Sequence, residues 1–241
     1  ISAGQDTRFI DSSTSAAKTE SAHSVDKVIS NLDHTGRADV IRYDAPAIMG
    51  LKLKTSWQHD GNWDVAAEYA DKVEGVKLKM RAGYTGMAGD ATKNHIATGS
   101  IALGLDSGFH VALAGGHENI GNVNDGIDLI AANVSPDTNN DGINDPHFYA
   151  VTVGYNAKMF APGTTAFAIN YNETKNKVYV ANQDDNKGTS LQFQAVQNFS
   201  SIGSAIGLEW AHYTYESETG AGVANTYDDI DAVTLSTVFK F

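Results

Sequence analysis

Oxygen-bearing side chains recur at alternate positions of the segment 137–146 and could together bind a calcium ion. The candidate ligands are the side chains of Asp137, Asn139, Asp141 and Asp145 and the backbone carbonyl of Ile143. Such a run, with Gly142 for a sharp turn, is typical of the first part of a calcium loop. The Glu that completes an EF-hand loop is absent, because Phe148 stands at its position. A structural calcium site is one interpretation, and an ordinary surface loop rich in Asn, Asp and Gly is the other.

A second set of chemically active side chains is basic and recurs at every other position of two segments. Lys52 and Lys54 alternate with apolar residues in one segment, and Lys77, Lys79 and Arg81 do so in another. Side chains two residues apart lie on the same face of a strand. A Lys or Arg at the midplane of a lipid-facing surface would cost about 2–4 kcal/mol. If these segments belong to a membrane barrel, the basic stripe must face a water-filled lumen.

Motifs for catalysis are absent from the sequence. Zero Cys excludes a disulfide framework, a thiol nucleophile and a Cys-ligated zinc site. There is no GxSxG, HExxH, P-loop or dinucleotide fingerprint, and the 8 His are scattered. We therefore expect a protein that is not an enzyme. A net charge of -12 makes nucleic acid an unsuitable partner.

The elements that carry these residues are predicted to be strands, because apolar and polar residues alternate with a period of two. The pattern predicts about 12 strands, each near the roughly 9–11 residues of a tilted membrane strand. The predicted strands are 1–5, 38–44, 50–58, 63–71, 76–84, 96–106, 109–116, 148–158, 165–172, 191–199, 205–213 and 232–241. No stretch approaches the roughly 20 apolar residues of a spanning helix.

The connections between the predicted strands alternate between short and long. Short ones are 45–49, 71–75, 106–108, 159–163 and 200–204, whereas long ones are 6–37, 85–95, 117–146, 173–189 and 216–229, with 58–62 as a brief member of the long set. Short turns on one side and longer loops on the other are the architecture of outer-membrane barrels. Aromatic residues near the segment ends, such as Trp57, Tyr84 and Tyr155, also suit interfacial girdles, although Tyr and Trp favour strands in general.

Two stretches resemble those of a known family, the Gram-negative trimeric outer-membrane porins. Ile41-Arg42-Tyr43-Asp44-Ala45-Pro46, followed by Gly50-Leu51, is similar to that family's strand after the constriction loop. The terminal segment 233–241, which ends in Phe241, is similar to the family's last strand. The resemblance implies a single all-β domain, a transmembrane antiparallel β-barrel of about 16 strands. Counting back from the last strand then makes 1–5 the fifth, so about four strands would precede this sequence; a complete barrel of about 12 strands is the alternative.

The resemblance also implies a function and a site. Segment 6–37 would fold into the pore as a constricting loop, 117–146 would be a long extracellular loop, and the protein would be a homotrimer in the bacterial outer membrane. Passive diffusion of small hydrophilic solutes and ions would be its function, with outer-membrane lipid and lipopolysaccharide around it. Arg42 would be a basic wall residue of the constriction, extended by the stripe above, and Asp26 and Asp33 would be acidic candidates on the loop. The family's own loop sequence is absent, and the preference for cations or anions stays open.

Two other functions remain compatible with the sequence. One is a smaller outer-membrane barrel with an adhesive or enzymatic role. The other is a soluble β-sandwich or carbohydrate-binding module with a calcium-stabilised loop, because alternation alone does not say whether the apolar face meets lipid or a second sheet.

Overall fold

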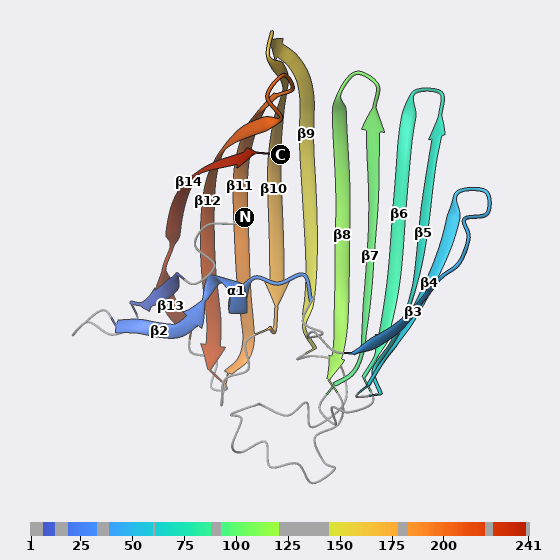
Figure 1. The fold of residues 1–241 in the computed structure, drawn as a ribbon. Helices are drawn as coiled ribbons and strands as arrows, with labels where there is room; N and C mark the ends of the chain where they lie inside the picture. Colours follow the sequence, from blue (N-terminus) through green and yellow to red (C-terminus); the bar gives the residue numbers. More distant parts are fainter. Residues whose placement is uncertain are drawn as a thin grey trace.

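The computed structural model describes residues 7–12, 19–32, 39–59, 61–87, 93–120, 145–177, 183–219 and 224–239. These residues form one antiparallel sheet of 14 strands and a single-turn helix (Figure 1). The elements are β1 (Arg8–Asp11), β2 (Thr19–Ser24), α1 (Val25–Val28), β3 (Val40–Asp44), β4 (Leu51–Gln58), β5 (Trp63–Val73), β6 (Val76–Gly86), β7 (Lys93–Leu105), β8 (Phe109–Ile120), β9 (His147–Phe160), β10 (Gly163–Lys175), β11 (Gln183–Phe199), β12 (Ser204–Thr219), β13 (Ala224–Asp228) and β14 (Ile230–Phe239). Among the described residues, no helix has the length and apolar character to cross a membrane.

Successive strands from β3 to β12 pair with their sequence neighbours, so this part of the sheet is a simple meander. The short turns of the meander gather at one end of the sheet, shown at the top in Figure 1. The β5–β6 turn shows why one end can be so tight: Glu74 and Gly75 both have positive φ, 47° and 86°, as a two-residue type I′ hairpin requires. The β5–β6 connection predicted to be short is therefore a two-residue turn.

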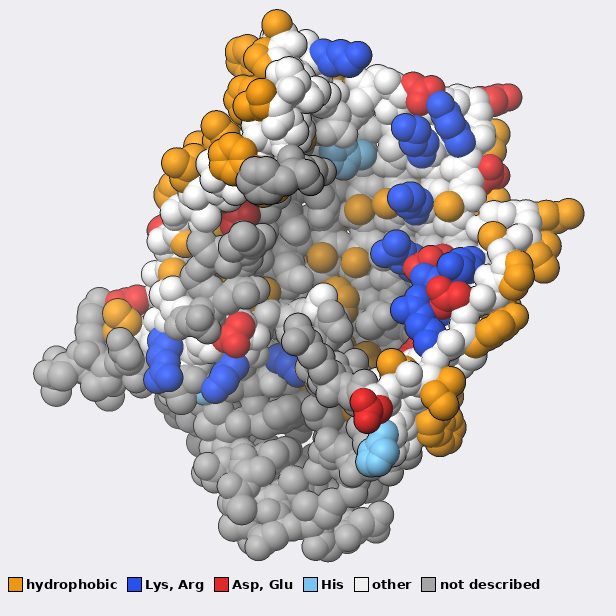
Figure 2. Space-filling view, viewed as in Figure 1, with side chains coloured by type: hydrophobic (Ala, Val, Ile, Leu, Met, Phe, Trp, Pro, Cys, Tyr) orange, Lys and Arg blue, Asp and Glu red, His pale blue; other side chains and the backbone are white. Residues whose placement is uncertain are grey.

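The pairing register divides the side chains into two faces. Val153 lies opposite Val111 on β8 and Ile169 on β10, and Ile169 lies opposite Phe193. All of these side chains belong to the outer face, which the sheet turns away from its hollow. Their neighbours one residue along, such as Thr152 and Asn170, belong to the inner face. Figure 2 shows the inner face as a hollowed surface, with apolar side chains at the rim where the outer face begins.

The outer face exposes large apolar side chains that a water-soluble sheet would bury. Val233 and Leu235 on β14 are 72% and 73% exposed, and Leu208 on the paired strand is 53% exposed. On β9, the registered outer positions from Tyr149 to Ala157 span eight residues, or about 26 Å at the rise of a strand and about 20 Å once tilted. That height is most of the apolar band of an outer-membrane barrel, which is about 25 Å tall. A soluble two-sheet sandwich is wrong for this chain, because the described strands form one sheet and leave this face uncovered.

The structure has 14 strands where the sequence predicted about 12. Eleven of the predicted strands are present, and 1–5 lies outside the described residues. Two short strands, β1 and β2, lie in the predicted loop 6–37, and β13 lies in the predicted loop 216–229. Several strands are also longer than predicted: β11 has 17 residues, and β8 continues to Ile120, inside the predicted loop 117–146. Most of these additions are polar at successive positions, so they carry no alternation and cannot be recognised by it.

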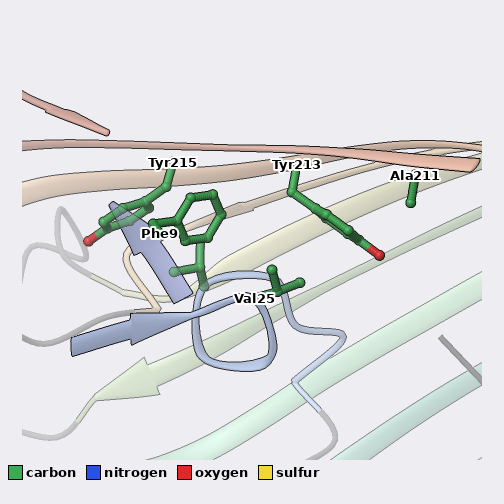
Figure 3. Packing of buried hydrophobic residues seen from close by; sticks show 6 residues of the cluster. Phe9, Val25, Ala211, Tyr213 and Tyr215 are labelled. Carbon is green, nitrogen blue, oxygen red and sulfur yellow. The ribbon is translucent and has the colours of Figure 1, made fainter. Parts of the chain in front are cut away.

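One segment, 19–32, crosses the inner face of the sheet, and we call it the strap. It comprises β2, α1 and the residues up to Leu32. At one end it contacts an apolar cluster in which Val25 of the strap and Phe9 of β1 pack against Ala211, Tyr213 and Tyr215 of β12 (Figure 3). Its last contact is a second cluster in which Leu32 packs against the inner-face residues Ile96 and Phe148. The strap therefore runs from β12 to β7 and β9 within the hollow of the sheet.

Candidate functional site

The hollow between the strap and the sheet is the candidate site. It includes a cavity of about 710 Å³. The strap contributes Asn31 and Leu32 to the lining, and β5 and β6 contribute charged side chains, Asp64, Glu68 and Arg81. On the far side, Asn170 and Asn172 of β10 offer amide groups. The cavity thus has a charged wall and a neutral polar wall, as suits an aqueous path rather than a site for an apolar ligand.

The middle of the strap is fixed by two contacts with the neutral wall. The hydroxyl of Thr174 accepts a hydrogen bond from the amide of Ser30 at 3.0 Å and donates one to the Ser30 carbonyl at 3.0 Å. Gly188 on β11 faces Val28, and a Cβ at this position would overlap the Val28 side chain and lie 2.9 Å from its carbonyl oxygen. The absence of a side chain at Gly188 therefore lets α1 approach the sheet.

The opposite wall, formed by β3 to β6, carries a network of ion pairs. Glu68 is shared by Lys54, at 2.8 Å, and Arg81, at 3.4 Å. Asp44 is shared in the same way by Arg42, at 2.7 Å, and Lys52, at 3.2 Å. Figure 2 shows these blue and red side chains mixed together over this half of the inner face. Each acid neutralises part of the charge of two basic residues.

The stripe of basic residues predicted from the sequence occupies a single face. Arg42, Lys52, Lys54, Lys77, Lys79 and Arg81 all have inner-face register. Two acids of this wall, Asp64 and Glu68, were not predicted from the sequence. Asp64 accepts a hydrogen bond from Ser56, and Glu68 is the partner described above. Both are polar positions of the β5 alternation, so the sequence did contain the signal that could have found them.

The acidic loop candidates have different outcomes. Asp26 lies in the first turn of α1, is exposed, and accepts a hydrogen bond from Ser24. Asp33 lies outside the described residues. Whether either carboxylate narrows the pore, and whether Arg42 belongs to the constriction, stays a prediction. Arg42 itself lies on β3, at one end of the strand order, and binds Asp44 of its own strand through two nitrogens.

Of the predicted calcium ligands, Asp137, Asn139, Asp141 and Ile143 lie outside the described residues. Asp145 is described and is 1% exposed. Its carboxylate accepts a hydrogen bond from the Asn119 amide at 3.1 Å and lies 3.4 Å from Nε2 of His117. Within the described part of the chain, no group of three or more His, Cys, Asp or Glu side chains is placed to hold a metal ion. The calcium site stays a prediction.

One curled antiparallel sheet, with an apolar outer face and a hollow, polar inner face, defines the class of this protein: a transmembrane β-barrel of the bacterial outer-membrane type. Within the described residues the sheet is open, and its strand order ends at β2 and β3.

No family model and no curated protein matches the chain. Among solved structures, it is similar to in-vitro folded OmpT, an outer membrane protein of Vibrio cholerae, with 10% identity and a TM-score of 0.47 over 98% of this chain and 67% of that one. It is also similar to the NanC porin in a rhombohedral crystal form, with 12% identity and a TM-score of 0.37 over 84% of this chain and 92% of that one. At these values neither likeness carries an argument, and the class rests on the faces and register described above.

Proposed function

We propose that this protein forms a water-filled channel in the bacterial outer membrane for the passive diffusion of small hydrophilic solutes and ions. The observation that carries the proposal is the strap, which crosses a charged and amide-lined hollow without filling it. A barrel that only anchored an adhesive loop would not need a cavity of about 710 Å³ lined by charged groups. Membership of the trimeric porin family, and with it a homotrimer surrounded by lipid and lipopolysaccharide, is part of the proposal.

Planar bilayers test the channel directly. Purified protein, folded in detergent, is added to one side, and we expect stepwise increases in ion current. A preparation that is folded by circular dichroism and yet gives no conductance would refute the proposal. Cross-linking in detergent tests the homotrimer separately. A protein that conducts as a monomer would refute the homotrimer and leave the channel function intact.

Arg42 provides a test of the wall. Replacing Arg42 by Ala removes one positive charge from the inner face and leaves Asp44 with Lys52 as its remaining basic partner. The reversal potential in a salt gradient should shift towards cation preference. Lys175→Ala is the matched control, because Lys175 lies on the outer face beside Glu173. Equal reversal potentials for Arg42→Ala and the native protein would exclude Arg42 from the constriction.

We also propose that a calcium ion braces the loop before β9, with Asp145 as the one ligand in the described chain. Its burial supports a role in holding the loop. Titration calorimetry with calcium chloride should give heat of binding that Asp141→Ala removes, and no heat from the native protein would refute the site.

A further inference from the structure

Three basic side chains follow one another along the inner face of β6. Arg81, Lys79 and Lys77 are two residues apart, so their Cα atoms step by about 7 Å towards the short-turn end of the sheet. The pairing of β6 with β5 and β7 places all three in the hollow. All three side chains are exposed.

The three residues differ in what lies beside them. Arg81 is opposite Glu68 on β5, and the two form an ion pair. Lys79 is opposite Ala70 on one side and Ala102 on the other. These small neighbours leave space around the ammonium group and bring no negative charge.

Lys77 has an even more positive environment. It is opposite Lys72 on β5 and Gly104 on β7. Lys72 has its own partner, Asp106 in the β7–β8 turn, at 3.0 Å. Among the described residues, no carboxylate lies within ion-pair distance of either Lys77 or Lys79. The other basic residues of this wall share Glu68 and Asp44; they are Arg42, Lys52, Lys54 and Arg81. Positive charge therefore remains uncompensated towards the short-turn end.

The facing strands do not supply the missing acid. Across the inner positions of β8 to β12 and β14, the acidic side chains in the described part of the chain are Glu118 and Glu209. Glu118 is fully buried at the end of β8 away from the short turns, and Glu209 accepts a hydrogen bond from Gln194 at 2.7 Å. Near the short turns, β9 adds one further exposed basic residue, Lys158.

We propose that Lys77 and Lys79, with Arg81 next to them on the side away from the short turns, form a binding path for small anionic solutes that carry carboxylate or phosphate groups, and that the channel therefore prefers anions. The inference rests on the proposed channel function. The spacing of about 7 Å allows an anion to leave one basic group as it reaches the next. A cation on the same path meets uncompensated positive charge in a confined aqueous space, where charges are screened less than in bulk water. The overall charge of -12 does not oppose this, because local wall charge decides which ion enters.

The test uses the double variant Lys77→Gln/Lys79→Gln, which keeps much of the side-chain length and removes two charges. In a potassium chloride gradient, the native channel should have an anion-to-cation permeability ratio above one, and the double variant should bring the ratio to one or below. The matched control is Lys175→Gln/Lys187→Gln, which removes the same charge from the outer face. The control should keep the native ratio.

Inorganic phosphate gives a second readout on the same proteins. Phosphate added on the short-turn side should reduce the chloride current of the native channel and of the control, and should have less effect on the double variant. The anion preference and the reduction of current by phosphate should both weaken at high salt, because the basic groups are exposed and salt screens their charge.

The outcomes separate the two proposals. A channel that conducts with a native ratio of one or below overturns the anion path and leaves the channel function intact. If the double variant keeps the native anion-to-cation permeability ratio, the anion path is likewise overturned and the channel function is left intact. Absence of conductance from folded native protein overturns the channel function and the anion path with it.

Discussion

The inner faces of the two halves of the sheet differ, although their outer faces are alike. On β3 to β6 the inner face carries ion pairs and uncovered basic residues, and on β9 to β12 it carries mostly uncharged side chains, several of them aromatic, to which the strap is bound. Both halves expose large apolar side chains on the outside, such as Leu53 and Ile169. Lipid sets one requirement for every outer position, whereas each inner position can serve either the solute or the strap. We therefore expect the proposed channel function to depend on the difference between the two halves of the inner face.

The largest effect should come from exchanging the roles of the two faces. Val153→Arg places a charge at the middle of the outer face of β9, where the cost of an Arg at the bilayer midplane is about 2–4 kcal/mol. Thr152→Arg places the same charge one residue away, on the inner face. Urea titration of protein folded into lipid vesicles should show a loss of stability for the first variant alone. Equal losses would mean that the two faces are not distinguished by lipid.

The next largest effect should come from β9 to β12, the half of the sheet to which the strap is bound. Gly188→Ala forces its new Cβ against Val28, and overpacking of this kind costs about 1–3 kcal/mol. The strap should move away from β11, and single-channel conductance should change. Gly104→Ala is the control on the uncovered half, because its nearest contact, Cβ of Lys77, lies 3.9 Å away. A native conductance in both variants would show that the strap does not narrow the path.

A smaller effect is expected at the hydrogen bonds of the strap. Thr174→Val removes the hydroxyl that bonds to Ser30, at a net cost of about 1 kcal/mol. Limited proteolysis should then cut the strap faster, without loss of the barrel's β-sheet signal in circular dichroism. Thr152→Val, which leaves the strap's bonds unchanged, should be cut at the native rate. Identical rates in the two variants would argue against this anchor.

The smallest effect should be a dependence of strap docking on pH. Burial lowers the pKa of His23 below its ordinary value of 6.5, and the nearby Lys27 lowers it further. The undocked strap therefore binds a proton at a higher pH than the docked one, so docking weakens as pH falls through about 6.5 and below. Conductance of the native channel should change between neutral and mildly acidic pH. His23→Phe keeps a ring against Tyr215 and should remove this dependence; a retained dependence would assign it to another group.

The outer face could be predicted from the sequence because lipid demands an apolar residue at every second position. The parity of Lys77, Lys79 and Arg81 followed from the same rule, and the register places all three on the inner face. The first part of β11 could not be found in this way, since residues 183–190 are polar on both faces and are held as a strand by pairing with β12, joined from Lys187 onward by pairing with β10. The contact of Val28 with Gly188 joins residues 160 positions apart and leaves no local pattern. The periodicity of the sequence therefore predicts which residues face lipid, and it predicts little about the contacts between the strap and the inner face.

The strap has a mechanical consequence for the shape of the barrel. A curved sheet can be viewed as an arc, and the strap follows the inside of that arc from the Tyr213 region of β12, past Gly188 of β11 and Thr174 of β10, to the Phe148 region of β9. Four neighbouring strands are therefore joined by one segment as well as by their own ladder hydrogen bonds. We expect the strap to stiffen this part of the wall, so that its removal would loosen the curvature of the sheet as well as open the hollow.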